Sequence, residues 1–144
     1  MKAYEYYKPQ TIQEAIYLME RLEDARFIAG GTDVLVLFRQ KKIAPKNLIS
    51  LRNIKDLIGI EERDGLWIGC GATHSDIMKN VFIGQHYSAL YDAVSNLGSC
   101  QIRNVATIGG NICNAAPSAD TACPLLVLDA RVVIVGPTNK QNVH

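Results

Sequence analysis

Residues 26–41 read RFIAGGTDVLVLFRQK, and this stretch decides the fold of the N-terminal part of the chain. Arg26 to Ala29 predict a strand, and the pair Gly30-Gly31 ends that strand with a turn. The Thr-Asp pair that follows offers an N-cap for a helix from Val34 to about Lys41. A strand that passes through a glycine turn into a helix is typical of a layered α/β fold.

The flanking segments extend this pattern in both directions. Tyr4 to Tyr7 predict a short strand, and Thr11 begins a helix whose apolar residues share one face. Leu48 to Leu51 predict a third strand. The order strand, helix, strand, helix, strand favours parallel pairing, so we expect residues 1–54 to form a first α/β lobe.

The rest of the chain, residues 55–144, predicts a second lobe. A hairpin forms around Asp64-Gly65, and two helices follow it. The stretch from Gln101 to Ser118 has no helical or strand period and reads as a polar, glycine-containing loop. Arg131 to Val135 predict a strand without a successor, so we expect an incomplete second lobe whose exposed edge favours self-association.

Composition excludes several classes of protein. The chain has 144 residues, of which 48% are hydrophobic and 20% are charged, as in a folded globular domain. Fifteen Lys and Arg against fourteen Asp and Glu leave no basic stripe for a nucleic acid, and no apolar run could span a membrane. The four cysteines lack metal-site spacing, so we expect small buried residues, no metal ligand and a cytoplasmic protein.

Two Gly-Gly pairs are the sequence's candidate binding loops. Gly30-Gly31 and Gly109-Gly110 each lie beside a threonine, with an acidic or amide residue close behind. Glycine leaves room for a ligand and lets successive backbone amides point at an anion, so two such loops would suit a diphosphate. Taken singly, each pair is more typical of an ordinary turn, because neither has the signature of a nucleoside triphosphate loop or of a dinucleotide fold.

A family resemblance goes further than these patterns. IAGGTDVL at 28–35 and QIRNVATIGGNICNAAPSAD at 101–120 resemble the two flavin-binding motifs of the FAD subunit of xanthine dehydrogenase-type molybdenum hydroxylases. The group includes the medium subunit of aerobic carbon monoxide dehydrogenase, and segments 7–15 and 69–77 also match it. The resemblance implies the two-lobed α/β (α+β) FAD-binding fold of the vanillyl-alcohol-oxidase/PCMH type. It also implies that the second lobe is truncated and that the family's C-terminal domain is absent.

The resemblance also implies a set of FAD-binding residues. The first motif would wrap the diphosphate through its backbone amides, and the second would close on it from the other lobe. Asp120 would accept hydrogen bonds from sugar or ribityl hydroxyls, and Leu97 would pack against the adenine. The full set is Ile28, Ala29, Gly30, Gly31, Thr32, Asp33, Val34, Leu97, Thr107, Gly110, Asn111, Cys113 and Asp120.

The implied function is electron transfer within a complex. Hydroxylation would occur in a molybdopterin-binding large subunit, and electrons would pass through [2Fe-2S] clusters of a small subunit to FAD and then to NAD or another acceptor. A purine is the expected substrate, and this chain would contain no catalytic residue of its own. We expect FAD binding rather than turnover from this chain alone. The alternative is a nucleotide-binding or assembly scaffold that keeps the fold without electron flow.

Overall fold

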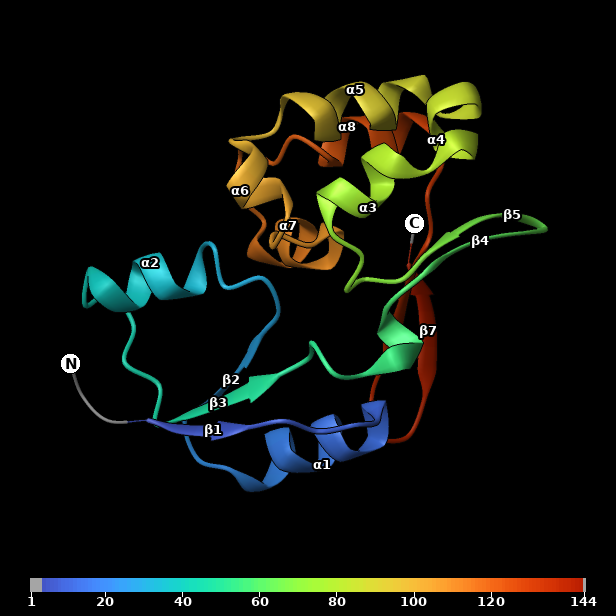
Figure 1. The fold of residues 1–144 in the computed structure, drawn as a ribbon. Coiled ribbons are helices and arrows are strands. Elements are labelled where there is room, and N and C mark those ends of the chain that lie inside the picture. The colour runs from blue at the N-terminus through green and yellow to red at the C-terminus, as the bar shows by residue number, and fades with distance from the viewer. Residues whose placement is uncertain (1–3, 144) are drawn as a thin grey trace.

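The first lobe is a three-stranded sheet with a helix on each side. The structure is a computed structural model that describes residues 4–143. The elements of this lobe are β1 (Glu5–Tyr7), α1 (Ile12–Arg21), β2 (Ala25–Ile28), α2 (Val34–Arg39) and β3 (Asn47–Ser50). The strands are parallel in the order β1-β3-β2, with Tyr6 opposite Leu48 and Phe27 opposite Ile49. Figure 1 shows α1 below this sheet and α2 above it, so the α/β fold class is confirmed.

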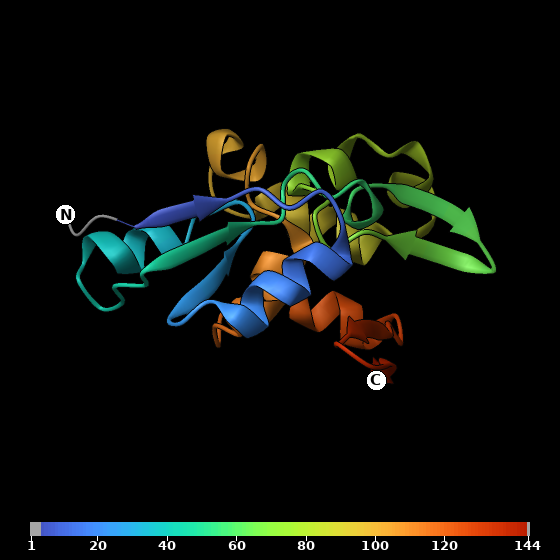
Figure 2. The same cartoon turned by 90° about the horizontal axis from the view of Figure 1, so that it is seen from below.

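Helix α1 begins where the sequence predicts. The Thr11 hydroxyl accepts a hydrogen bond from the Glu14 amide at 3.1 Å, and the Glu14 carboxylate accepts one from the Gln10 amide at 2.8 Å. Ala15 on the buried face of α1 packs with Ile49 and Ile54, which form the core of the first lobe. In Figure 2, α1 crosses in front of the sheet, and the β4–β5 hairpin extends away at the end opposite α2.

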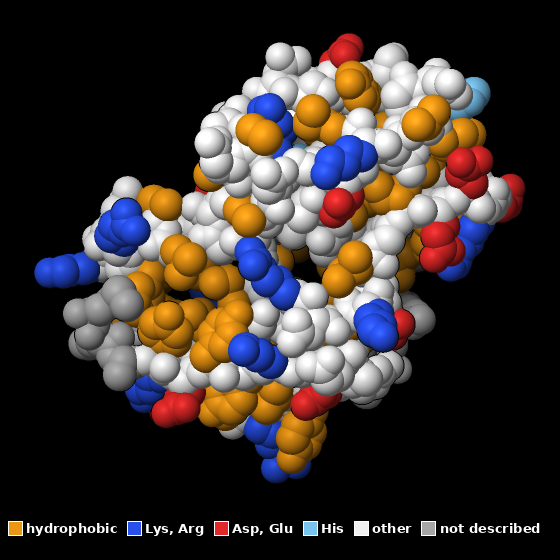
Figure 3. Space-filling model, viewed as in Figure 1, with side chains coloured by type: hydrophobic (Ala, Val, Ile, Leu, Met, Phe, Trp, Pro, Cys, Tyr) orange, Lys and Arg blue, Asp and Glu red, His pale blue; other side chains and the backbone are white. Residues whose placement is uncertain are grey.

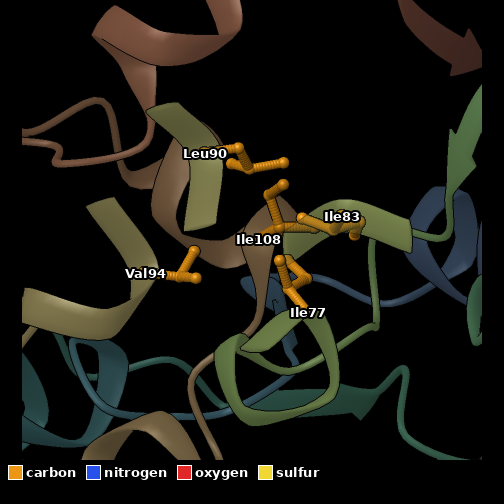
Figure 4. Packing of buried hydrophobic residues seen from close by; sticks show 5 residues of the cluster. All are labelled: Ile77, Ile83, Leu90, Val94 and Ile108. Carbon is orange, nitrogen blue, oxygen red and sulfur yellow. The ribbon is translucent and has the colours of Figure 1, made fainter. Parts of the chain in front are cut away.

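The second lobe is mainly helical. The elements of residues 55–144 are η1 (Lys55–Leu57), β4 (Ile60–Arg63), β5 (Gly65–Ile68), α3 (His74–Lys79), α4 (Val81–His86), α5 (Ser88–Asn96), α6 (Cys100–Arg103), α7 (Ile108–Asn114), α8 (Ala122–Val127), β6 (Val132–Val135) and β7 (Lys140–Val143). Of these, η1 packs through Leu57 against the core of the first lobe, and the turn between β6 and β7 lies beside α1. Buried side chains from α3, α4, α5 and α7 meet in a second core, shown in Figure 4: Ile77, Ile83, Leu90, Val94 and Ile108. The two lobes therefore have separate cores.

Several local predictions for the second lobe are confirmed. Thr73 and Asp76 form a reciprocal capping box at the start of α3. Gly98 follows α5 with φ +52°, the left-handed conformation that favours glycine after a helix. The hairpin around Asp64-Gly65 pairs β4 with β5.

Three predictions for this lobe are wrong. The stretch 101–118 contains α7 and most of α6, which are too short for a sequence period to reveal. The chain continues from β6 into β7, which pairs with it in an antiparallel hairpin, so the last predicted strand has a successor. All four cysteines are exposed rather than buried, because two of them line the space between the lobes and two lie on outward-facing helical surface. No helix among the described residues is long and apolar enough to cross a membrane.

Candidate functional site

The two lobes enclose a cleft of about 1250 Å³. One wall comes from the sheet and the loop between β2 and α2, and the other comes from the turn before α3, the segments on either side of α6, and helix α7. Figure 3 shows a hollow between the lobes on one face of the molecule. The cleft is lined by twelve of the thirteen residues that the family resemblance implies: Ala29, Gly30, Gly31, Thr32, Asp33, Val34, Leu97, Thr107, Gly110, Asn111, Cys113 and Asp120.

Ile28 is the remaining member of that set. It ends β2, has 7% exposure and lies in the first lobe away from the cleft lining. Its Cδ1 would lie 3.3 Å from a Cβ placed on Gly31, so the Ile28 side chain packs next to the loop without lining the cleft. This position gives Ile28 a packing role beneath the first Gly-Gly pair.

The first Gly-Gly pair needs glycine at both positions, for different reasons. Gly31 has φ +78°, a left-handed conformation that a side chain disfavours. A Cβ on Gly30 would overlap the Val105 carbonyl oxygen and lie 2.8 Å from the Ala106 Cα. Gly30 therefore allows the loop of the first lobe to touch the backbone of the second lobe.

The backbone amides of this loop have no acceptor in the protein. Within the described residues, the four consecutive amides of 30–33 donate no hydrogen bond to any backbone or side-chain group. The Thr32 hydroxyl likewise has no partner among these residues. Unpaired amides that line a cleft leave donors available for an anionic ligand, because a backbone amide sealed away from any acceptor is costly.

The second Gly-Gly pair has a different arrangement. The Ile108 amide donates to the Ala72 carbonyl, the Gly109 amide to the Cys70 carbonyl, and the Asn111 amide to the Thr107 carbonyl, at 2.9–3.0 Å. The Gly110 amide donates to the Thr107 hydroxyl at 3.1 Å, which makes Thr107 the N-cap of α7. All four amides of this loop are therefore used within the protein.

Gly109 is required by packing between neighbouring chain segments. A Cβ at this position would lie 2.6 Å from both the Cβ and the carbonyl oxygen of Cys70. The backbone around Thr73 and Thr107 forms an isolated antiparallel bridge beside this contact, and the His74 amide donates to the Ala106 carbonyl. The second loop is thus joined to the segment before α3, and its amides at 108–111 are not free to bind a ligand.

Three side chains of the second motif have distinct surroundings. The Asn111 side-chain oxygen accepts a hydrogen bond from the hydroxyl of Thr121, which is fully buried, so Asn111 ties α7 to the start of α8. Asp120 is exposed at the cleft and makes no hydrogen bond to any of the described residues. Burial and the neighbouring Cys113 raise the pKa of the Cys70 thiol, although part of Cys70 remains open to the cleft.

His74 is the buried titratable group of the cleft. Its side chain is 1% exposed, and its Nδ1 has no hydrogen-bond partner within residues 4–143. Burial lowers the pKa of this imidazole below its ordinary value, while the carboxylate of Asp120 opposes that effect. The residues that the structure describes contain no group of three metal-ligating side chains.

Sequence reasoning missed Arg52, which lies directly after Leu51 at the end of the first lobe. Its Nε donates to the Ala29 carbonyl at 3.0 Å and its Nη2 to the Gly30 carbonyl at 3.3 Å. The parallel pairing was predicted from the sequence, but its register was not: in the structure Ile28 lies opposite Ser50, and the same register places Gly30 beside Arg52. Arg52 also lines the cleft.

Comparisons with known proteins agree with this geometry. The family described as FAD binding domain in molybdopterin dehydrogenase matches residues 2–144. The xanthine dehydrogenase FAD-binding subunit of Escherichia coli O157:H7 is 38% identical over 134 residues, which cover 92% of this chain and 46% of that protein. The nicotinate dehydrogenase FAD-subunit of Eubacterium barkeri is 36% identical over 137 residues, covering 93% of this chain and 46% of that protein.

Solved structures share the fold over nearly the whole chain. Carbon monoxide dehydrogenase from Hydrogenophaga pseudoflava superposes with a TM-score of 0.95 and 29% identity, covering 99% of this chain and 50% of that chain. Quinoline 2-oxidoreductase from Pseudomonas putida 86 gives a TM-score of 0.94 and 28% identity, covering 99% of this chain and 51% of that chain. The chain spans about half the length of the relatives it matches.

Proposed function

Because this chain belongs to the family of FAD binding domains in molybdopterin dehydrogenases, we propose that its cleft binds FAD. The observation that carries the proposal is the run of four backbone amides at 30–33 that lack an acceptor within the described residues. A diphosphate is acceptor-rich and anionic, so it would satisfy several of these donors at once. The glycines keep the loop free of side chains that would block this approach.

The remaining roles follow from the surroundings of each side chain. The amides of Ala29 to Asp33 and the Thr32 hydroxyl would hold the diphosphate. Asp120 would accept hydrogen bonds from sugar or ribityl hydroxyls, which suits an exposed carboxylate that accepts no hydrogen bond from the described residues. Leu97, with 9% exposure, would pack against the adenine without stacking on it. Val34 and Cys113 would complete the apolar lining.

The second loop would act differently from the first. Because its amides are already bonded, Thr107, Gly110 and Asn111 would shape the wall that faces the cofactor instead of presenting free amides to its phosphates. The hydrogen of the Thr107 hydroxyl remains available as a donor, since the oxygen accepts from Gly110.

At the level of the complex, we propose that this chain is the flavoprotein part of an oxidoreductase. Bound FAD would supply redox chemistry that no side chain offers. The protein would join a molybdopterin-binding large subunit and an iron–sulfur small subunit, and electrons would leave the complex to NAD or another acceptor by way of this subunit. Support comes from relatives named as FAD-binding subunits of xanthine and nicotinate dehydrogenases, and a purine is the proposed substrate class.

A spectroscopic titration tests this proposal. The purified chain is titrated with FAD and, in parallel, with riboflavin, which lacks both phosphates and the adenosine. We expect a bound flavin spectrum with FAD that bleaches with dithionite and recovers with an electron acceptor, and much weaker uptake of riboflavin. An assembly scaffold predicts no flavin uptake. Absence of FAD binding both alone and with the partner subunits would refute the proposal.

A further inference from the structure

Arg52 holds two consecutive carbonyl groups of the first Gly-Gly loop. Its Nε and Nη2 lie on one edge of the planar guanidinium and donate to the Ala29 and Gly30 oxygens. The backbone next to Arg52 is fixed to the sheet, because the amide of the preceding residue, Leu51, donates to the Ile28 carbonyl at 2.9 Å. The Arg52 amide also donates to the Ser50 hydroxyl at 3.4 Å. The arginine therefore connects the loop to the adjacent strand β3.

This contact fixes the orientation of two peptide groups. In a planar trans peptide, the N–H points opposite to the C=O of the same unit. The carbonyls of Ala29 and Gly30 belong to the same units as the amides of Gly30 and Gly31. When Arg52 holds those carbonyls, the two amides are directed away from the guanidinium, and both lack an acceptor among the described residues.

A Gly-Gly segment needs such a restraint. Glycine populates positive and negative φ about equally, so the peptide units around 30 and 31 can rotate at low cost. Rotation of either unit would turn a carbonyl oxygen toward the side where the amide now lies. A carbonyl oxygen facing a diphosphate repels it, whereas an N–H attracts it. When the two peptide units are already fixed before the ligand binds, binding no longer has to include the loss of their conformational entropy, so the ligand binds more tightly.

The charge of Arg52 adds to this effect. Ion pairs in the described part of the chain join Lys46 to Glu23 and Arg63 to Glu61, and none involves Arg52. An arginine that bonds only to carbonyl oxygens keeps its full positive charge at the cleft. Lysine would keep the charge, but a single ammonium cannot reproduce the planar fork that spans two carbonyls.

We infer that Arg52 is a positioning residue that holds the amides of Gly30 and Gly31 in the orientation required by a diphosphate. The inference rests on the proposed function, since it specifies how the same cleft recognises its ligand. The inference concerns the diphosphate and not the flavin: binding of any nucleoside diphosphate should depend on Arg52, and binding of the corresponding nucleoside should not.

The test compares ligands with and without phosphates in three variants of the full chain. FAD, ADP and adenosine are titrated into the wild type, Arg52→Gln and Arg52→Lys, with Arg39→Gln as the matched control. Arg39 is also an exposed arginine, but it ends α2 and does not line the cleft. We expect Arg52→Gln to weaken FAD and ADP by at least about tenfold while leaving adenosine unchanged. Arg39→Gln should bind all three ligands as the wild type does.

Arg52→Lys separates orientation from charge. We expect it to lose most of the affinity that Arg52→Gln loses, and we expect the amide NMR signals of Gly30 and Gly31 to broaden or shift in both variants. Wild-type ADP affinity in Arg52→Lys, or equal losses of ADP and adenosine in Arg52→Gln, would overturn the inference. Those results would leave the proposed function intact, whereas a wild type that binds neither FAD nor ADP, both alone and with the partner subunits, would refute the proposed function itself.

Discussion

The two Gly-Gly loops look alike in sequence and differ in how they use their backbone. Each pair lies beside a threonine and lines the same cleft. The first loop leaves the amides of 30–33 without acceptors in the described structure, and its carbonyls are held by Arg52. The second loop donates the amides of 108–111 to its own chain. A glycine pair therefore indicates close approach of backbone, but the approaching group can be a ligand or another segment of the protein.

The comparison also separates the glycines by what they touch. Gly30 and Gly109 each face backbone of a neighbouring segment, whereas Gly31 is required for its conformation. Substitutions at these positions should therefore fail in different ways, and the largest failure is expected where backbone would collide with backbone.

Gly30→Ala should have the largest effect. Its methyl group would overlap the Val105 carbonyl oxygen, which belongs to the second lobe and cannot move without separating the lobes. We expect a loss of about 2–4 kcal/mol in the free energy of unfolding, together with loss of FAD binding. Urea unfolding and FAD titration measure both effects.

Gly84→Ala is the matched control for this substitution. Gly84 is exposed on α4, and its new methyl group would lie 3.7 Å from the Tyr91 ring, an ordinary contact. Replacing a helical glycine with alanine should stabilise the chain by roughly 0.5–1 kcal/mol. A Gly30→Ala variant as stable as the wild type would mean that the lobes do not meet at this point.

Gly31→Val should have the next largest effect on binding. Valine at φ +78° is strained, and its branched side chain would crowd Leu35 and Ile28 at 3.2–3.3 Å. We expect the loop to change conformation, with a loss of about 1–3 kcal/mol of stability and no stoichiometric FAD in the purified protein. Gly110→Ala, whose methyl would lie 3.0 Å from the Thr107 hydroxyl and would meet no backbone of another segment, should retain FAD. Retention of flavin by Gly31→Val would refute the role of the first loop.

The two threonines should separate binding from stability. Thr32→Val removes a hydroxyl that has no partner among the described residues, so FAD affinity should fall several-fold while the free energy of unfolding stays within about 0.5 kcal/mol. Thr107→Val removes the N-cap of α7, so stability should fall by about 1 kcal/mol and FAD affinity should change less. Parallel titrations and urea unfolding of the two variants test this crossed pattern. If one of the two variants loses more of both FAD affinity and stability than the other, the two loops do not differ in role.

The sequence was a good guide where local chemistry determines the structure. The capping box at Thr73, the left-handed Gly98 and the Asp64-Gly65 hairpin follow from residue preferences within a few positions. It failed for α6 and α7, because these helices have only four and seven residues and are stabilised by contacts made elsewhere. Helix α7 is held in place by Ile108, which packs in the second core, and by hydrogen bonds from the Ile108 and Gly109 amides to the carbonyls of Ala72 and Cys70.

The same limit applies to the cleft. The sequence motifs identified both loops, because each loop is a Gly-Gly pair next to a threonine in the amino-acid sequence. They could not show which loop keeps its amides free, since that depends on segments such as Cys70 to Ala72 that are distant in sequence. Arg52 was missed because its role depends on a neighbouring strand, although the register of β2 and β3 places it beside Gly30.

The smallest predicted effect is a pH dependence that concerns the second loop alone. The His74 amide donates to the Ala106 carbonyl, so this residue helps to join the second loop to α3. Burial lowers the pKa of the His74 imidazole, and Asp120 only partly opposes this. The unfolded chain therefore binds a proton more readily than the folded chain. The stability contributed by neutral His74 should be fully present above pH about 6.5, and it should fall as the pH drops toward the lowered pKa.

The slope of this loss cannot exceed about 1.4 kcal/mol per pH unit, the limit for one proton. Urea unfolding across this range should show a decline in the wild type that His74→Gln reduces and His86→Gln, at an exposed position on α4, leaves unchanged. We expect FAD to protect the wild type less at low pH, because protonation of the buried His74 would disturb the wall that the second loop contributes to the cleft. An identical pH slope in the wild type and His74→Gln would show that another group controls the acid sensitivity and that the second loop does not depend on a neutral His74.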